Sequence, residues 1–289
     1  MNNNLLELDA FKSFMKEYNF PKELKINIIF TDDIENEYKK QMNNLNKQYD
    51  YISPIDYNGI TCVPNTIDEE TILLINNDRV KELKNKNYDV IYTIFHELIH
   101  ANDYYNYAKK YCNGKYDSSK DRDSLYGFQN WAEFNAKKIS YYEYCKLAHG
   151  KKINSVEELN NIIANELPVK NKEIEEFLID NNIDMEKIIY NLMFYLGRYS
   201  IWEKLFPKEF SNNCKFPDEL NKYKPVVDEL YEALKNNSGK LQDYIEIKKL
   251  INHFKGAWVN ILNNNWFLHT FLHTFCNKFE ANLSYKEKI

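Results

Sequence analysis

The stretch VIYTIFHELIHANDYY, residues 90–105, decides the fold because it sets polar side chains into a helix that is otherwise apolar or aromatic. These polar side chains include His96, Glu97 and His100. Burying a carboxylate between imidazoles is costly unless something pairs with it. Residues four apart on a helix stand one above the other, about 5 to 6 Å apart at Cβ. Both imidazoles can therefore converge on one ion, and a metal supplies the missing pairing.

The pattern H-E-x-x-H is typical of a catalytic zinc site. Zinc takes imidazole nitrogens at about 2.0 to 2.1 Å, and a catalytic site combines three protein ligands with an open position. Glu97 is then the expected general base. Zinc lowers the pKa of water toward about 7, and Glu97 accepts the proton and passes it to the leaving amine. The alternative is that these residues have this spacing by chance on a helix that only packs.

The third zinc ligand must come from a later helix, because ANDYYNYAKK follows His100 without another histidine. The segment NWAEFNAKK, residues 130–138, offers Glu133. The small side chains of Ala132 and Ala136 allow this segment to approach the first helix closely. Two histidines and a glutamate form an established catalytic zinc set, so Glu133 is the predicted third ligand. The alternative is a surface glutamate on an amphipathic helix.

Asp103 lies on the same predicted helix face as the histidines, seven residues after His96 and three after His100. The favoured role is that of an acceptor for the free N–H of a ligating imidazole, since such carboxylates fix the tautomer of the ligand. Direct ligation of the metal by Asp103 and a solvent-facing position near the helix end remain the two alternatives.

The order of the expected elements predicts an α+β protein. Only 7 Gly and 7 Pro in 289 residues leave little turn chemistry for a many-stranded sandwich or barrel, so helices should dominate. Apolar spacing predicts a first helix that ends by Pro21 and a polar helix over 34–49. Short β-branched runs predict strands over 24–30, 57–63 and 71–77. Further helices are predicted over 78–85, 88–110, 126–148, 155–165, 171–180, 184–205, 218–236, 240–254 and 257–281.

This order divides the chain into two expected domains. Residues 1–150 form a small N-terminal sheet with the active-site helices, and residues 151–289 form an all-helical part that completes the cleft. A polar loop over 112–127 separates the two helices that carry the metal ligands, and residues 207–220 are the best interior linker.

Charge and cysteine content predict a cytoplasmic protein. The net charge of −5 argues against non-specific binding to nucleic acid, which relies on a positive field. The five cysteines are an odd number without a C-x-x-C pair, so they are expected to be reduced thiols. The N-terminus lacks the basic region of a signal peptide, and no apolar run approaches the length of a membrane span. The expected partner is a protein or peptide substrate.

HELIH at 96–100, followed some thirty residues later by Glu133 on a second helix, resembles the gluzincin branch of the zincin metallopeptidases, which includes thermolysin-like enzymes. The resemblance covers residues 24–149. It implies a zincin-like fold in which an edge strand, either 57–63 or 71–77, pairs with an extended peptide beside the histidine helix.

The chain departs from known zincin patterns around Glu133. It lacks the N-E-x-x-S-D sequence of thermolysin-like enzymes, which leaves Asp103 as the expected supporting carboxylate. More loosely, the chain resembles intracellular repressor-cleaving peptidases of the ImmA/IrrE type, but Lys137 and Lys138 stand where their fuller E-x-x-A-N-x-F-A pattern continues.

A peptidase also needs a donor near the developing oxyanion. Candidates from the C-terminal half are Tyr195, Arg198, Tyr199 and His269. His269 and His273 are also four apart, but no carboxylate lies between them, so core or interface histidines are favoured over a second metal site. Two other functions stay open. One is a non-enzymatic helical interaction protein with a structural or degenerate metal site, and the other is a regulator that binds nucleic acid or a repressor and cleaves on signal.

Overall fold

A computed structural model describes residues 9–47, 58–78, 89–116, 122–148, 185–205 and 223–260. Its helices are α1 (Asp9–Glu17), α2 (Ile34–Asn44), α4 (Asp89–Tyr111), α5 (Arg122–Ala148), α7 (Met185–Leu205) and α9 (Lys224–Lys235), with a further helix over 241–260. Its strands are β1 (Ile26–Thr31), β2 (Gly59–Cys62) and β3 (Thr71–Asn76). The coarse prediction of an α+β protein with a small sheet and mostly helical content is confirmed.

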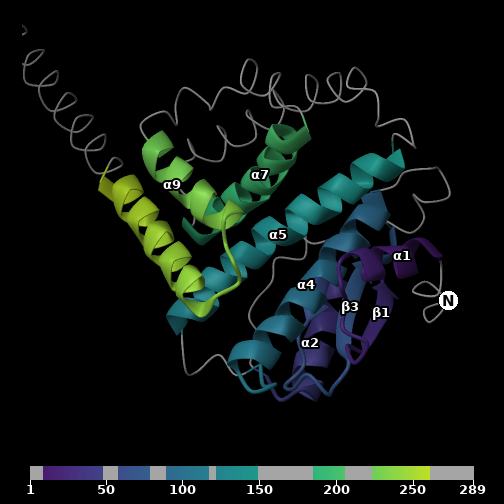
Figure 1. Cartoon of the computed structure of the whole chain (residues 1–289). Coiled ribbons are helices and arrows are strands. Elements are labelled where there is room, and N and C mark those ends of the chain that lie inside the picture. The colour runs from purple at the N-terminus through teal and green to yellow at the C-terminus, as the bar shows by residue number, and fades with distance from the viewer. Residues whose placement is uncertain are drawn as a thin grey trace, which may run out of the picture.

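The long helices α4 and α5 run side by side through the middle of the molecule (Figure 1). The sheet, α1 and α2 lie on the α4 side, whereas α7, α9 and the helix over 241–260 lie on the α5 side. Each side has its own apolar core, so the α4–α5 pair separates two hydrophobic clusters. None of the described helices combines the length and the apolar character that a membrane crossing requires.

The sheet has the order β1-β3-β2, with β1 parallel and β2 antiparallel to β3. β3 occupies the centre because its side chains are apolar on both faces. Leu73 and Ile75 pack with α1 and α4, and Leu74 packs with Met42 of α2. The expectation that residues 71–77 might serve as the substrate-pairing edge is therefore wrong, whereas β2 does lie at an edge.

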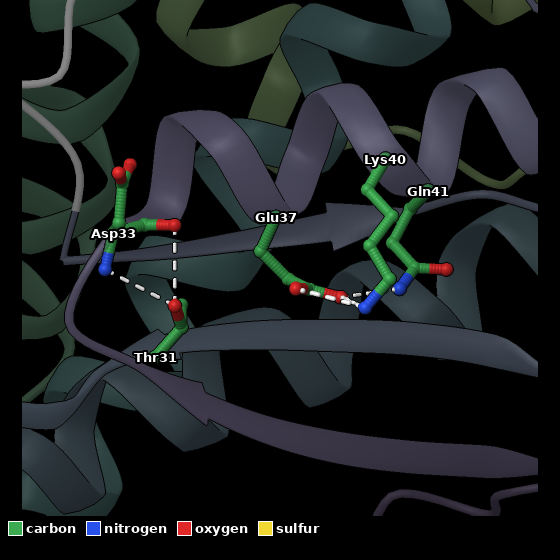
Figure 2. A network of polar contacts seen from close by, with 5 residues as sticks. All are labelled: Thr31, Asp33, Glu37, Lys40 and Gln41. Atoms are coloured by element: carbon green, nitrogen blue, oxygen red, sulfur yellow. Dashed lines mark hydrogen bonds and ion pairs between the residues drawn. The ribbon is translucent and has the colours of Figure 1, made fainter.

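Helix α2 is fixed at the end of β1 by a polar network, which Figure 2 shows from close by. The Asp33 side chain accepts the N–H of the third residue of α2, which satisfies a donor that the helix itself cannot pair. Thr31 Oγ1 accepts the Asp33 N–H at 3.1 Å. One turn later, Glu37 accepts hydrogen bonds from Lys40 at 3.0 Å and from Gln41 at 2.6 Å. These contacts hold α2 over the outer face of the sheet.

Two boundaries differ from the sequence prediction. The predicted break between helices over 240–254 and 257–281 is wrong, because one helix runs over 241–260. Gly256 lies within it, and a single glycine costs a helix only about 1 kcal/mol, too little to end it here. The predicted loop over 112–127 is too long, because α5 begins at Arg122.

Several predicted features lie outside the described residues. They are the helices over 155–165 and 171–180, residues 79–85, the part of the last helix beyond 260, the linker over 207–220 and the domain boundary at 150.

Two helical glycines provide a matched test of the packing. A Cβ at Gly127 of α5 would overlap the backbone of Tyr244, whereas a Cβ at Gly256 meets nothing within 4 Å. Gly127→Ala should therefore lower the free energy of unfolding by about 3 kcal/mol. Gly256→Ala should raise it by up to about 1 kcal/mol, because alanine is the better helix former. Urea denaturation measures both values, and equal effects would contradict the close crossing at Gly127.

Candidate metal centre

Two rows of side chains line the contact between α4 and α5. Because helical residues four apart share a face, each row is a series at that spacing. The rows are Tyr92, His96, His100 and Tyr104 on α4, and Gln129, Glu133 and Lys137 on α5.

The outer members of the rows meet across the contact. Lys137 is buried, and its ammonium lies 4.4 Å from the ring centroids of Tyr92 and of Phe194 on α7. At the opposite end, the side chain of Gln129 lies within hydrogen-bonding reach of the Tyr104 hydroxyl. The two rows are therefore in register, and their middle members face each other.

The middle of the rows brings His96, His100 and Glu133 together. The Nε2 atoms of the two histidines are 3.0 Å apart. The Glu133 carboxylate places Oε2 at 3.5 Å from His96 Nε2 and Oε1 at 3.3 Å from His100 Nε2. Ligands at about 2.0 to 2.1 Å around a tetrahedral zinc ion stand about 3.3 Å from one another. The spacing of the two imidazole nitrogens and the two carboxylate oxygens is thus close to that of the ligands in a zinc site.

Burial leaves the cluster accessible on one side only. His96, Glu97 and His100 are 7%, 6% and 6% exposed. The Glu133 side chain is 25% exposed although its Oε2 atom is buried, so the cluster is least covered around this side chain.

The charges of His100 and Glu133 stabilise each other. Burial alone disfavours protonated His100, but the Glu133 carboxylate outweighs it and raises the pKa of His100 to about 9. Burial alone raises the pKa of Glu133, but the two histidines outweigh it and hold that pKa well below its usual range. Without a metal, a proton on His100 neutralises the carboxylate. A metal ion must therefore displace this proton when it binds.

The donor set fits a zinc ion. Two imidazole nitrogens and one carboxylate oxygen lie within 4.8 Å of one another, and they are the ligands that zinc takes in many hydrolases. Within the described part of the chain, the buried Glu133 Oε2 has no hydrogen-bond partner. A buried carboxylate oxygen without a donor is costly, and coordination would remove that cost.

Asp103 does not take the role that the sequence predicted. Its Oδ2 accepts a hydrogen bond from Asn135 Nδ2 of α5 at 2.9 Å. The Nδ1 atoms of His96 and His100 are buried and lack a hydrogen-bond partner among the described residues. Asp103 also lies outside the three-residue cluster. The reason is that Asn135 offers a donor across the helix contact, which turns the carboxylate toward α5.

Glu97 is held by strand β2, beside the cluster. Thr61 Oγ1 lies 2.7 Å from Glu97 Oε2, to which it donates, and 3.1 Å from the Glu97 carbonyl oxygen. Gly59 packs so closely that a Cβ there would meet Thr93 at 2.8 Å and the Glu97 side chain at 3.0 Å. Sequence reasoning missed both β2 residues. The sequence feature that could have identified them is a glycine and a threonine two residues apart, which places both on one face of a predicted strand.

Three of the four oxyanion candidates, Tyr195, Arg198 and Tyr199, contact aromatic side chains of the helical core. The rings of Tyr195 and Tyr199 lie 6.5 Å from Trp202 and 5.2 Å from Tyr231, centroid to centroid. The Arg198 guanidinium lies 5.3 Å from the Tyr141 ring centroid. Tyr195 belongs to the helical core, Tyr199 packs against it, and Arg198 lies over the Tyr141 ring of that core. His269 and His273 lie outside the described residues.

Two aromatic side chains that the sequence did not single out lie at the cluster instead. Phe194 of α7 packs against His96, with ring centroids 5.3 Å apart. Tyr104 lies one turn after His100 on α4, with ring centroids 6.4 Å apart. The spacing of Tyr104 from His100 was a usable signal, but 23 tyrosines in the chain obscured it.

Comparisons with known protein families, with curated proteins and with solved structures gave no match. What bears on function is therefore the chemistry of the cluster and of the side chains around it. The zincin fold, the zinc ion and the cytoplasmic location stay predictions.

The partly buried carboxyl of Asp103 gives a prediction about pH. Burial raises the pKa of Asp103 from 3.8 to about 7, so the folded protein holds this proton at pH values where the unfolded chain releases it. The contribution of Asp103 to stability is therefore present below about pH 4 and is lost as pH rises toward 7. Asp103→Asn keeps an acceptor for Asn135 and removes the titration. In chelator-treated protein, the variant should gain stability over the wild type at pH 8 relative to pH 5, as measured by urea denaturation. If the difference in free energy of unfolding between the variant and the wild type is the same at pH 5 and pH 8, the raised pKa of Asp103 is contradicted.

Proposed function

We propose that this chain is a zinc-dependent metallopeptidase that hydrolyses peptide bonds in an intracellular protein or peptide. One observation carries the proposal: His96, His100 and Glu133 converge as three metal donors, while Glu97 is held beside them but outside the donor set. Structural zinc sites are closed by four protein ligands, and catalytic sites keep one position open. Three donors within the described residues favour the catalytic kind.

Each side chain of the centre has a chemical role in this proposal. His96, His100 and Glu133 hold the zinc ion. Zinc in such a site acts as a Lewis acid on a carbonyl group and lowers the pKa of water to about 7. Glu97 accepts a proton from the attacking water and passes it to the leaving amine. The hydroxyl of Thr61, at 2.7 Å, fixes the orientation of the Glu97 carboxylate through both steps.

Strand β2 is suited to hold the substrate. Its described pairing is with β3 alone, which leaves its second edge for an extended peptide. A peptide added there gains main-chain hydrogen bonds, as in other cases of strand addition. Since Thr61 of β2 contacts Glu97, such a peptide runs beside the general base. This arrangement supports the zincin-like architecture that the sequence predicts.

Tyr104 is the best placed oxyanion donor. Burial raises the pKa of its hydroxyl, with a further contribution from the Glu133 charge, so the phenol stays protonated at neutral pH. The side chain of Gln129 lies within hydrogen-bonding reach of the Tyr104 hydroxyl and can orient it. A neutral donor in a partly buried site stabilises developing negative charge on a carbonyl oxygen.

Zinc content and hydrolysis together test the proposal. The purified protein should contain one zinc ion per chain, measured by elemental analysis. Glu97→Gln should keep this zinc and lose at least 100-fold in peptide hydrolysis, because it removes the proton acceptor but no ligand. Glu133→Gln should lose both zinc and activity. Cleavage profiling of a proteome with the wild type and the Glu97→Gln variant identifies substrates.

The same measurements separate the peptidase from a scaffold with a structural metal. In a scaffold, chelation lowers the melting temperature and no cleavage distinguishes the wild type from Glu97→Gln. Equal cleavage by the wild type and Glu97→Gln, or a protein that contains no zinc after preparation with added metal, would contradict the peptidase proposal.

Tyr104→Phe should lower kcat by about 100-fold with little change in KM, because it removes a donor used in the transition state. The matched control is Tyr142→Phe in α5, a partly buried tyrosine that contacts Lys146. The control should retain full activity. If both variants have the same kcat, Tyr104 is not the oxyanion donor.

A further inference from the structure

A pocket of about 290 Å³ lies between α2, β2, the second half of α4 and the first turns of α5. The lining residues that matter here are Lys47, Thr61, Tyr104, Lys115, Tyr116 and Gln129. Three of them join the pocket to the metal centre. Thr61 contacts Glu97, Tyr104 lies beside His100, and Gln129 precedes Glu133 by one helical turn.

The charged side chains that line this pocket are both lysines. Lys47 Nζ donates to the carbonyl oxygens of Val63 at 2.6 Å and Pro64 at 2.8 Å, and its third hydrogen remains for another acceptor. Lys115 is exposed, and its ammonium has no ion-pair partner in the part of the chain that is described. Neither an aspartate nor a glutamate belongs to the described lining. The described lining therefore carries two positive charges and no negative charge. Burial lowers the pKa of Lys47, and the carboxylate of Glu69, which lies outside the lining, acts in the opposite direction.

Three carboxylates outside the lining already accept hydrogen bonds from protein groups. Glu37 accepts hydrogen bonds from Lys40 and Gln41. Glu69 accepts the backbone N–H of Asn65 at 2.8 Å. Glu97 accepts a hydrogen bond from Thr61 beside the cluster. Its side chain does not line the pocket.

We propose that this pocket receives a carboxylate of the substrate, next to the peptide bond that the metal centre hydrolyses. The position relative to the cleaved bond rests on the proposed peptidase function. The carboxylate comes from an acidic side chain or from the C-terminal end of a peptide. Lys47 and Lys115 provide the charge-assisted hydrogen bonds, and the rings of Tyr104 and Tyr116 cover the apolar part of the bound residue.

Peptide binding to the zinc-loaded Glu97→Gln protein tests this inference without any turnover. The probes are acetylated, amidated pentapeptides of alanine in which one Glu or one Gln occupies each position in turn. Isothermal titration calorimetry should give at least one position at which Glu binds about tenfold more tightly than Gln, since a charged hydrogen bond is lost with Gln. This preference should weaken as salt rises from 50 to 500 mM. The C-terminal carboxylate as the source is tested by comparing an alanine peptide that has a free C-terminus with the same peptide as its amide.

Lys115→Met should abolish the preference, whereas Lys16→Met should keep it. Lys16 is equally exposed but lies on α1 and does not line the pocket. Because Lys115 is exposed, its replacement should leave the melting temperature within a few degrees of the original.

Equal affinity of the charged and uncharged peptides, or no binding at millimolar concentration, overturns the inference. Peptide hydrolysis without any preference for acidic residues refutes carboxylate binding in the pocket but not the proposed peptidase function. Binding of the acidic peptides by a wild type that cleaves nothing refutes the peptidase instead.

Discussion

The packing of α4 against α5 is the constraint on which the metal centre depends. Neither helix holds a site alone, because the histidines come from one and the carboxylate from the other. Their approach is close since Ala132 and Ala136 flank Glu133 and are fully buried. A larger side chain at either alanine would separate the helices by more than the tolerance of zinc coordination, which is a few tenths of an ångström.

The two apolar cores keep this helix pair in place from opposite sides. On α4, Ile94 and Leu98 point into the sheet-side core, while His96 and His100 face α5. On α5, Phe134 packs into the helical core next to the glutamate that crosses to the histidines. The sheet and the C-terminal helices thus act together on the site, since loss of either core would let the donor atoms move apart. The cost of burying the polar cluster is offset by both cores rather than by local contacts.

The sequence predicted those members of the cluster that are marked by helical spacing or by small neighbouring side chains. Convergence of the imidazoles follows from spacing along α4, and the approach of Glu133 follows from its small neighbours. Features that depend on how two elements rotate against each other were not predictable. Asn135 takes Asp103 because of the rotation of α5, and Thr61 reaches Glu97 because β2 is the strand under α4. Likewise, the sequence of α7 did not show which of its faces packs against His96, because apolar residues occur on all sides of this helix.

The two ends of the α4–α5 rows give the site a direction. One end is closed, because Lys137 is buried between the rings of Tyr92 and Phe194. The other end continues past Tyr104 and Gln129 into the positively charged pocket. In the proposed peptidase, a substrate would therefore approach from β2 and the pocket rather than past Lys137. Thr61 of β2 also lines the pocket, so the proposed general base Glu97 and the neutral phenol of Tyr104 would both border that approach, as proton transfer and stabilisation of a developing oxyanion require.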